Sequence, residues 1–488
     1  VALPCRGRVV AMMSSFQGAQ APLNCPHSGA NAPGAPGSIS APSATAEAED
    51  FWQQVFSHVT YGAAAISRGD FDTARTTLAD VLFSTTAGLA ADPRAGFACS
   101  LGVAATYRVL ALAFCADGGL VRGTWAFRRA HQIALRFQHL AMVWITHAWE
   151  RFARREEPGT GMATYDRNYI DASSWPISLQ EINVEMTQVQ HAIGQDGRPA
   201  GHIPRWPSVP HDFRDLKLRI GIVSLCAYPS DHVLPKYATS NHQIYADRHG
   251  YRYHVGRERL DPERPPAWGK IVMMHRALQE PEVDWWLWFD CDTYFMNMSV
   301  TLDSLLYKYG AVRTSGEEDS GSADVGLDPD FQMLVAEDHA MLNTGAFFLR
   351  SSDWSKDFLR NVWGPDDSIW TDHPWWENAA ILWNFLKDNS QKFRDGDLPA
   401  GAEGAAEDDM DGIYPTEVKL APQSEFNSYH PATSHFLHDT WEEGKFALAF
   451  NGVLSNTSPT VIQALYGNYY ELACELNQVE DQCVAVEE

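Results

Sequence analysis

Short β-rich runs alternate with helical patterns between residues 218 and 290, and this alternation limits the chain to few folds. Buried strands are predicted for three runs rich in β-branched and aromatic residues, "LRIGIVSLCA" (218–227), "YRYHVGR" (251–257) and "DWWLWFD" (284–290). Helices are predicted between them at 235–250 and 269–280. Two βα units that lead into a third strand predict an α/β fold.

The third strand ends in two carboxylates, Asp290 and Asp292, within "DWWLWFDCDTYFMN" (284–297). Burying an ionised carboxylate costs several kcal/mol or more unless a partner compensates it. Ligands of open α/β sheets collect at the carboxyl ends of strands, and alternation lets both carboxylates face one point while Cys291 faces away. A hard divalent cation, Mn²⁺ or Mg²⁺, shared with a diphosphate would compensate both.

Two enzyme classes use such a pair of aspartates. Haloacid-dehalogenase phosphatases need Thr or Val two residues after the second aspartate, where this chain has Tyr294, and their strand does not usually follow two βα units. Nucleotide-sugar glycosyltransferases carry a metal on the donor diphosphate through a DxD motif. The second class is favoured, and the alternative for a bare DxD is a solvated pair at a strand end.

The length of 488 residues exceeds the ~250–300 residues that one hydrophobic core usually serves, which predicts more than one domain. From composition and periodicity we predict a disordered or processed leader (1–48), an all-α domain (49–193), a Pro/Gly-containing linker (194–215), the α/β domain (216–470) and an acidic tail (471–488). Within the helical domain, 61–83 reads as two helices around a Gly69-Asp70 turn. It resembles one tetratricopeptide-type unit or is a plain hairpin, and could bind a protein partner.

Charge, cysteines and hydropathy bear on three further points: a nucleic-acid partner, a disulfide loop and a membrane span. A formal net charge of -25 argues against nucleic acid as a partner, because phosphate binding needs a clustered basic surface. Cys474 and Cys483 either close a small loop in the acidic tail or are unrelated thiols. The apolar run 97–115 carries Arg108 in its middle, which favours a buried helix pair over a membrane span.

Six segments occur in an order that matches a known family: "YADRHGYRYHV" (245–255), "AWGKIVMMHRAL" (267–278), "WWLWFDCDTYFMN" (285–297), "LNTGAFFLRSSDWS" (342–355), "WWENAAILWNFL" (375–386) and "PQSEFNSYH" (422–430). Together they resemble family 34 glycosyltransferases, which include fungal galactosyl- and mannosyltransferases and plant xyloglucan xylosyltransferases. The resemblance covers roughly residues 216 to 455.

This resemblance implies a GT-A fold, a Rossmann-like mixed sheet flanked by helices. It implies a Mn²⁺-dependent retaining transfer of a hexosyl or pentosyl unit from a UDP- or GDP-linked sugar to a glycan or glycoprotein acceptor. It also implies a membrane-associated enzyme acting in the Golgi or another secretory-pathway lumen.

The resemblance also assigns roles to residues. Asp290 and Asp292 would bind the metal and the diphosphate. The remaining donor-site positions are Ala227, Tyr228 and Pro229 against the nucleotide, Lys270 beside the donor, and Asn343, Thr344 and Gly345 near the transferred sugar.

Glu377 and Asn378 occupy the place of the family's acidic–amide pair, which contacts sugar hydroxyls and helps to stabilise positive charge at the anomeric carbon. Each assignment has an alternative: Lys270 as a solvated helix residue, Asn343 as a turn former and Glu377 as a surface charge. Trp375 and Trp376 suit stacking on a sugar or filling a core.

One segment departs from the family pattern. The family closes its site with a segment like "EGDFVVHFAGC", whose His is a metal ligand, whereas this chain has "EGKFALAFNGV" (443–453) with Ala449 at the His position and Lys445 in place of an acid. Three interpretations stay open: His435 or His438 substitutes, the metal is held by two aspartates with diphosphate and water, or the protein is a catalytically impaired nucleotide-sugar-binding or scaffold protein.

Overall fold

The computed structural model describes residues 47–70, 218–313, 325–338, 342–365, 375–386, 414–432, 440–451 and 459–485, with shorter pieces within 73–165 and 368–373. The chain divides into two compact units, one made of 1–198 with 385–413 and the other of 199–384 with 414–488. Residues 1–46 of the predicted leader and the predicted linker 194–215 lie outside the described residues.

The second unit is built on a mixed six-stranded sheet. Its strands are β3 (Ile220–Leu225), β4 (Arg252–Gly256), β5 (Trp285–Phe289), β9 (Met333–Glu337), β10 (Leu342–Arg350) and β11 (Val418–Pro422), in the spatial order β11-β9-β10-β5-β3-β4. β10 runs antiparallel to both neighbours, and the other neighbouring pairs are parallel. The α/β fold and the first three strands are therefore confirmed.

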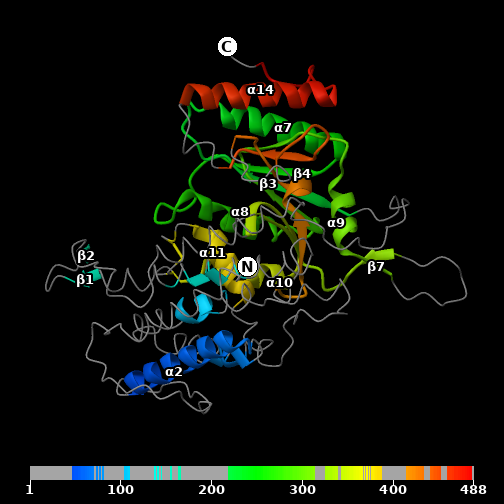
Figure 1. Ribbon diagram of the computed structural model, residues 1–488. Helices are drawn as coiled ribbons and strands as arrows, with labels where there is room; N and C mark the ends of the chain where they lie inside the picture. The colour runs from blue at the N-terminus through cyan, green and yellow to red at the C-terminus, as the bar shows by residue number, and fades with distance from the viewer. Residues whose placement is uncertain are drawn as a thin grey trace, which may run out of the picture. The chain divides into compact units, whose positions relative to one another are not determined.

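Helices cover both faces of this sheet (Figure 1). α7 (Leu234–His249) and α14 (Pro459–Asn477) pack together on one side, and α8 (Gly269–Ala277) with α10 (Asp353–Trp363) lie on the other. α7 ends at Gly250, whose φ of 72° is left-handed and suits glycine. The two predicted helices are thus confirmed, with Gly250 as the terminator of the first.

Shorter elements surround the sheet. They are the 3₁₀ turn η4 (Pro266–Trp268), helices α9 (Leu302–Gly310), α11 (Trp376–Leu386) and α13 (Gln423–Phe426), the hairpin of β7 (Ala311–Arg313) with β8 (Val325–Leu327), and a second sheet ordered β12-β13-β6. The second sheet consists of β12 (Ser428–Tyr429), β13 (Ala447–Ala449) and β6 (Thr293–Phe295). Its strand β6 begins directly after the Asp290–Asp292 pair.

β5 places tryptophans in the core, where Trp285, Trp286 and Trp288 are each at most 2% exposed. The ring of Trp286 lies against Gly221 of the neighbouring strand. A Cβ at Gly221 would stand 2.2 Å from a carbon of that ring. Close approach of the two strands therefore requires glycine at this position.

The first unit contains α2 (Glu47–Arg68), which ends at Gly69 with a φ of 80°. The Asp70 carboxylate then accepts a hydrogen bond from the Thr73 amide at 3.2 Å, as an N-cap does. The predicted turn at Gly69-Asp70 is confirmed.

Elsewhere in this unit β1 (Arg154–Glu156) pairs antiparallel with β2 (Ala163–Tyr165), so the segment 49–193 is not wholly helical. The extent of a helical domain there stays a prediction. Among the described residues, no helix combines the length and apolar character needed to cross a membrane.

The predicted acidic tail is not separate from the α/β domain, because α14 runs through its boundary at 470/471. Tyr470 shares a 2.7 Å hydrogen bond with Ser240 of α7, and Tyr470, Ala473 and Cys474 are buried. Cys474 is bonded to Cys483, which confirms the predicted small loop. The acidic residues of this segment are interspersed with apolar residues that form the buried face of α14. The acidic composition did not reveal this face.

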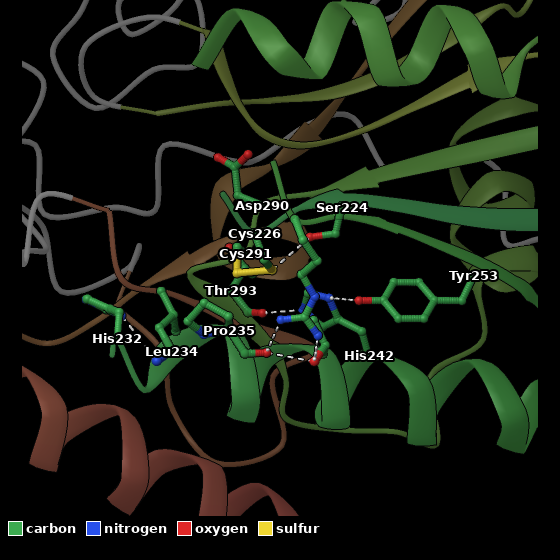
Figure 2. Close-up of a disulfide and its surroundings, with 12 residues drawn as sticks. Ser224, Cys226, His232, Leu234, Pro235, His242, Tyr253, Asp290, Cys291 and Thr293 are labelled. Atoms are coloured by element: carbon green, nitrogen blue, oxygen red, sulfur yellow. Dashed lines mark hydrogen bonds between the residues drawn. A yellow bond between two sulfur atoms is a disulfide. The ribbon is translucent and has the colours of Figure 1, made fainter. Parts of the chain in front are cut away.

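His242 on α7 joins the two sheets. Its Nε2 lies 2.7 Å from the Thr293 carbonyl oxygen and its Nδ1 3.3 Å from the Tyr253 hydroxyl, as Figure 2 shows. A neutral ring that donates through Nε2 and accepts through Nδ1 satisfies both partners. Burial lowers the pKa of His242 to about 4, against the smaller opposing effect of the Thr293 carbonyl.

This pKa predicts how stability responds to acid. Because the unfolded state takes up the His242 proton near pH 6.5 and the folded state only near pH 4, stability is lost as pH falls through this window, by about 3 kcal/mol. We expect His242→Gln to remove most of this pH dependence, measured by urea unfolding between pH 7 and 4. His254→Gln, at the surface beside Glu280, is the control, and equal curves for wild type and His242→Gln would contradict the prediction.

Candidate active site

Asp290 and Asp292 lie in the turn between β5 and β6, at the carboxyl end of β5 as predicted. The Asp290 amide donates to the Gly345 carbonyl at 2.8 Å, and the Phe450 amide donates to the Asp292 carbonyl at 2.8 Å. The turn is therefore held on one side by β10 and on the other by the end of β13.

The Asp290 carboxylate belongs to a buried charge cluster around Lys270. Its Oδ1 accepts a hydrogen bond from Trp288 Nε1 at 2.7 Å and lies 3.5 Å from Lys270 Nζ. Lys270 Nζ also lies 2.8 Å from Glu377 Oε1 and donates to the Thr344 carbonyl at 3.0 Å. The side chains of Lys270 and Glu377 are 5% and 1% exposed, so neither is the solvated surface charge that was the alternative.

Burial and a neighbouring carboxylate raise the pKa of each aspartate. Burial raises the pKa of Asp292 to about 7, and the Asp290 charge acts in the same direction. Burial also raises the pKa of Asp290, with Glu377 adding and Lys270 opposing. Burial of Lys270 lowers its pKa, but the charges of Asp290 and Glu377 outweigh it and the net shift is upward.

The cluster carries more negative than positive charge. Three carboxylates, Asp290, Asp292 and Glu377, act on the single ammonium of Lys270. If all three ionise, two negative charges stay uncompensated within it, which is the charge of one divalent cation. Carboxylate oxygens are also the ligands that Mn²⁺ and Mg²⁺ prefer.

Asn378 is oriented by Thr344. Its Oδ1 accepts from the Thr344 amide at 3.1 Å and from the Thr344 hydroxyl at 2.5 Å, and its Nδ2 donates to Glu377 Oε1 at 3.4 Å. Glu377 Oε2 is buried without a hydrogen-bond partner in the described part of the chain. This oxygen is an acceptor that a hydroxyl group could satisfy.

Asn343 links β10 to the segment after β11. Its Oδ1 accepts from the Gly345 amide at 2.9 Å and from Asn427 Nδ2 at 3.0 Å, and its Nδ2 donates to the Tyr429 hydroxyl at 3.0 Å. It is therefore a buried bridging residue within a strand, not a turn former. A Cβ at Gly345 would lie 2.8 Å from Asn427 Nδ2, so glycine keeps this network closed.

The loop that follows β3 contains Ala227, Tyr228 and Pro229. Burial raises the pKa of Tyr228, and the charges of Asp292 and Asp290 raise it further, so the hydroxyl is electrostatically coupled to the aspartate pair. Tyr228 and Pro229 also line a pocket of about 950 Å³, together with residues of α7 and β4. The structure thus brings the loop and the aspartates into one neighbourhood.

Ala449 pairs with Thr293 across β13 and β6, directly beside the aspartate turn, and is fully buried. Its methyl group offers no ligand. His435 and His438, the possible substitutes, lie outside the described residues. Within the described ranges, no group of three or more His, Cys, Asp or Glu side chains is arranged to hold a metal.

Several features of the site were not predicted from the sequence. The Trp288 hydrogen bond to Asp290 was missed, although the indole lies two residues before the aspartate. Cys291 is bonded to Cys226, and a cysteine at the carboxyl end of each of two predicted strands was the available signal. Trp375 and Trp376, which precede Glu377, are 42% and 40% exposed.

The charge cluster predicts a large effect of removing the ammonium. We expect Lys270→Met to lower the free energy of unfolding by about 3–5 kcal/mol, because Glu377 and Asp290 lose their buried partner. Adding Glu377→Gln to this variant should restore part of the lost free energy. Urea denaturation measures both. Lys308→Met, whose ion pair with Glu425 is exposed, should cost under about 1 kcal/mol; equal costs for the two lysines would contradict the cluster's role.

Comparisons with known proteins identify relatives of the α/β part of the chain. A profile of the galactosyl transferase GMA12/MNN10 family matches residues 223–457. The probable glycosyltransferase 2 of Oryza sativa subsp. indica is 27% identical over 257 residues, which cover 50% of this chain and 46% of the rice protein.

Two other relatives carry more specific names. The probable alpha-1,6-mannosyltransferase of Saccharomyces cerevisiae is 26% identical over 140 residues, covering 26% of this chain and 35% of its own length. The probable xyloglucan 6-xylosyltransferase 1 of Oryza sativa subsp. indica is 29% identical over 171 residues, covering 33% and 34%. The chain spans less than half the length of each of these relatives. Residues 223–457 belong to the galactosyl transferase GMA12/MNN10 family.

Proposed function

We propose that the second unit is a metal-dependent, retaining glycosyltransferase with a GT-A fold. It transfers a hexosyl or pentosyl unit from a UDP- or GDP-linked sugar to a glycan or glycoprotein acceptor. The observation that carries this proposal is the aspartate pair at the carboxyl end of β5, part of a buried cluster in which three carboxylates face the ammonium of Lys270. A nucleotide diphosphate brings no positive charge of its own, so its binding there requires a cation.

Asp290 and Asp292 would hold a divalent cation, Mn²⁺ or Mg²⁺, with the diphosphate and water supplying the other ligands. When bound, such a cation neutralises the leaving diphosphate as a Lewis acid. The protein contributes a prepared arrangement: Trp288 and Lys270 fix the Asp290 carboxylate before the donor arrives. Such preparation lowers the cost of organising charge during the reaction.

The sugar would lie between the aspartate turn and Glu377. Lys270 holds Glu377 in place, and Glu377 Oε2 is available to accept a sugar hydroxyl. The negative charge of Glu377 would stabilise positive charge that develops at the anomeric carbon. Asn378 and Thr344 orient this carboxylate through their mutual hydrogen bonds.

Retention of configuration has two routes in this arrangement. The acceptor hydroxyl can attack from the face that the diphosphate leaves, with a phosphate oxygen taking its proton. Alternatively, a carboxylate attacks the anomeric carbon as its bond to the diphosphate breaks, and the acceptor hydroxyl then displaces that carboxylate; Glu377, buried in the cluster, is the candidate. Positioning carries most of the catalysis in the first route.

A second candidate function is donor binding without turnover, favoured by Ala449 in place of a histidine ligand. Such a protein would act as a nucleotide-sugar-binding or scaffold module, with the first unit as a possible site for a protein partner. Measuring donor hydrolysis beside donor binding separates the two functions.

We propose the Golgi or another secretory-pathway lumen as the compartment. Cys226–Cys291 and Cys474–Cys483 are both disulfide-bonded, and such bonds persist in oxidising compartments. The proposal includes a membrane-associated enzyme and a glycan or glycoprotein acceptor. The exposed rings of Trp375 and Trp376 beside Glu377 suit contact with an acceptor sugar.

Removing the aspartates tests the metal–donor site. We expect Asp290→Asn with Asp292→Asn to weaken Mn²⁺-dependent binding of UDP or GDP at least roughly 100-fold, because even changes behind metal ligands cost 10–100-fold. Isothermal titration calorimetry measures this binding. Asp284→Asn, in an exposed ion pair with Arg219 just before the same strand, should bind like wild type, and metal-dependent binding by the double variant would remove the donor site from this turn.

Replacing Glu377 tests its role in the reaction. We expect Glu377→Gln to lower the rate of nucleotide-sugar hydrolysis or transfer by about 10²–10³-fold, as the loss of one preorganised charge does, with donor affinity within about threefold. Glu425→Gln, in an exposed pair with Lys308, should keep the wild-type rate. A loss of affinity as large as the loss of rate would make Glu377 a donor-binding group only.

A further inference from the structure

The Cys226–Cys291 disulfide joins two parts of the site proposed above. Cys226 is the first residue after β3, and Cys291 lies between Asp290 and Asp292. Both are nearly fully buried, at 1% and 3% exposure. Figure 2 shows the bond beside Asp290 and the beginning of the loop after β3.

The bond continues the register of the sheet beyond its last backbone pair. β3 and β5 pair from Ile220↔Trp285 to Val223↔Trp288, always with an offset of 65 residues. The two cysteines are also 65 residues apart. They are therefore the positions that would face each other if the two strands continued, and the disulfide replaces backbone pairing where the chains diverge.

The two diverging segments hold different parts of the proposed donor site. On one side, the Cys226 amide donates to the Gly256 carbonyl at 2.8 Å, and the chain then forms the loop of Tyr228 and Pro229, which line the pocket. On the other side, the chain forms the turn that presents both carboxylates. The disulfide holds the beginnings of the two segments together, with the Cα atoms of Cys226 and Cys291 5.2 Å apart.

We propose that the Cys226–Cys291 disulfide positions the loop of Tyr228 and Pro229 relative to the metal-binding aspartates. The nucleoside and the metal–diphosphate would then be bound together. This inference rests on the proposed function. Neither cysteine touches the reacting atoms, and the disulfide acts through the segments that it joins. Its specific consequence is energetic coupling: Mn²⁺ strengthens UDP or GDP binding because one rigid unit contacts both ends of the nucleotide.

The test measures this coupling with Cys226→Ser, Cys291→Ser. Calorimetry gives the nucleotide affinity with and without Mn²⁺, below the unfolding temperature of each protein, and the ratio of the two affinities is the coupling factor. We expect this factor to fall about tenfold, within the range of typical coupling between sites. A disulfide that only stabilises the fold would lower the unfolding temperature and leave the factor unchanged, and that result would overturn the proposal.

The second disulfide supplies a matched control. Cys474→Ser, Cys483→Ser removes the same kind of bond at the end of α14, and we expect the wild-type coupling factor. If this control loses the coupling equally, loosening anywhere in the unit explains the effect and the proposal falls. If wild type itself shows no metal-dependent nucleotide binding, the proposed function fails first, and this inference with it.

A second variant covers a failure to fold. Cys226→Ala, Cys291→Val fills the space of the disulfide with apolar atoms and should show the same loss of coupling. If neither variant folds while the control does, the bond belongs to the scaffold of the sheet and the positioning role is refuted.

Discussion

The buried ammonium of Lys270 is the interaction on which the site depends. It lies within 3.5 Å of carboxylate oxygens from two distant segments and donates to the Thr344 carbonyl as well. Without it, Asp290 and Glu377 would be negative charges in a poorly solvated place, which costs several kcal/mol. With it, three carboxylates still face one ammonium, so one residue both permits the arrangement and leaves carboxylate oxygens for a cation.

The α/β elements could be predicted because their signals are local. A helix that ends at Gly250 and a strand rich in buried tryptophans are visible in short windows of sequence, and the structure confirms both. The position of Asp290 and Asp292 at a strand end follows from the same windows. The tail was misjudged because its acidic residues concealed the buried face of α14.

Contacts between distant segments could not be predicted from local patterns. The resemblance brought Lys270, Glu377 and Asn343 to the site as a set, but only the fold shows which atoms meet. The hydrogen bonds of Asn343 to Asn427 and Tyr429 join a strand to a segment more than eighty residues later. The Cys226–Cys291 pair could have been found by extending the strand register, yet the register itself depends on tertiary structure.

The contact between Gly221 and Trp286 limits how this sequence can diverge. Because a Cβ at Gly221 would stand 2.2 Å from the indole, a larger residue there is acceptable only if position 286 becomes smaller at the same time. Positions 221 and 286 are therefore expected to change together. A larger residue at 221 alone would clash with the indole, and a smaller residue at 286 alone would leave a cavity. Trp286 belongs to β5, which leads into the turn of Asp290 and Asp292. A change in the core at this point would therefore also affect the geometry of the site.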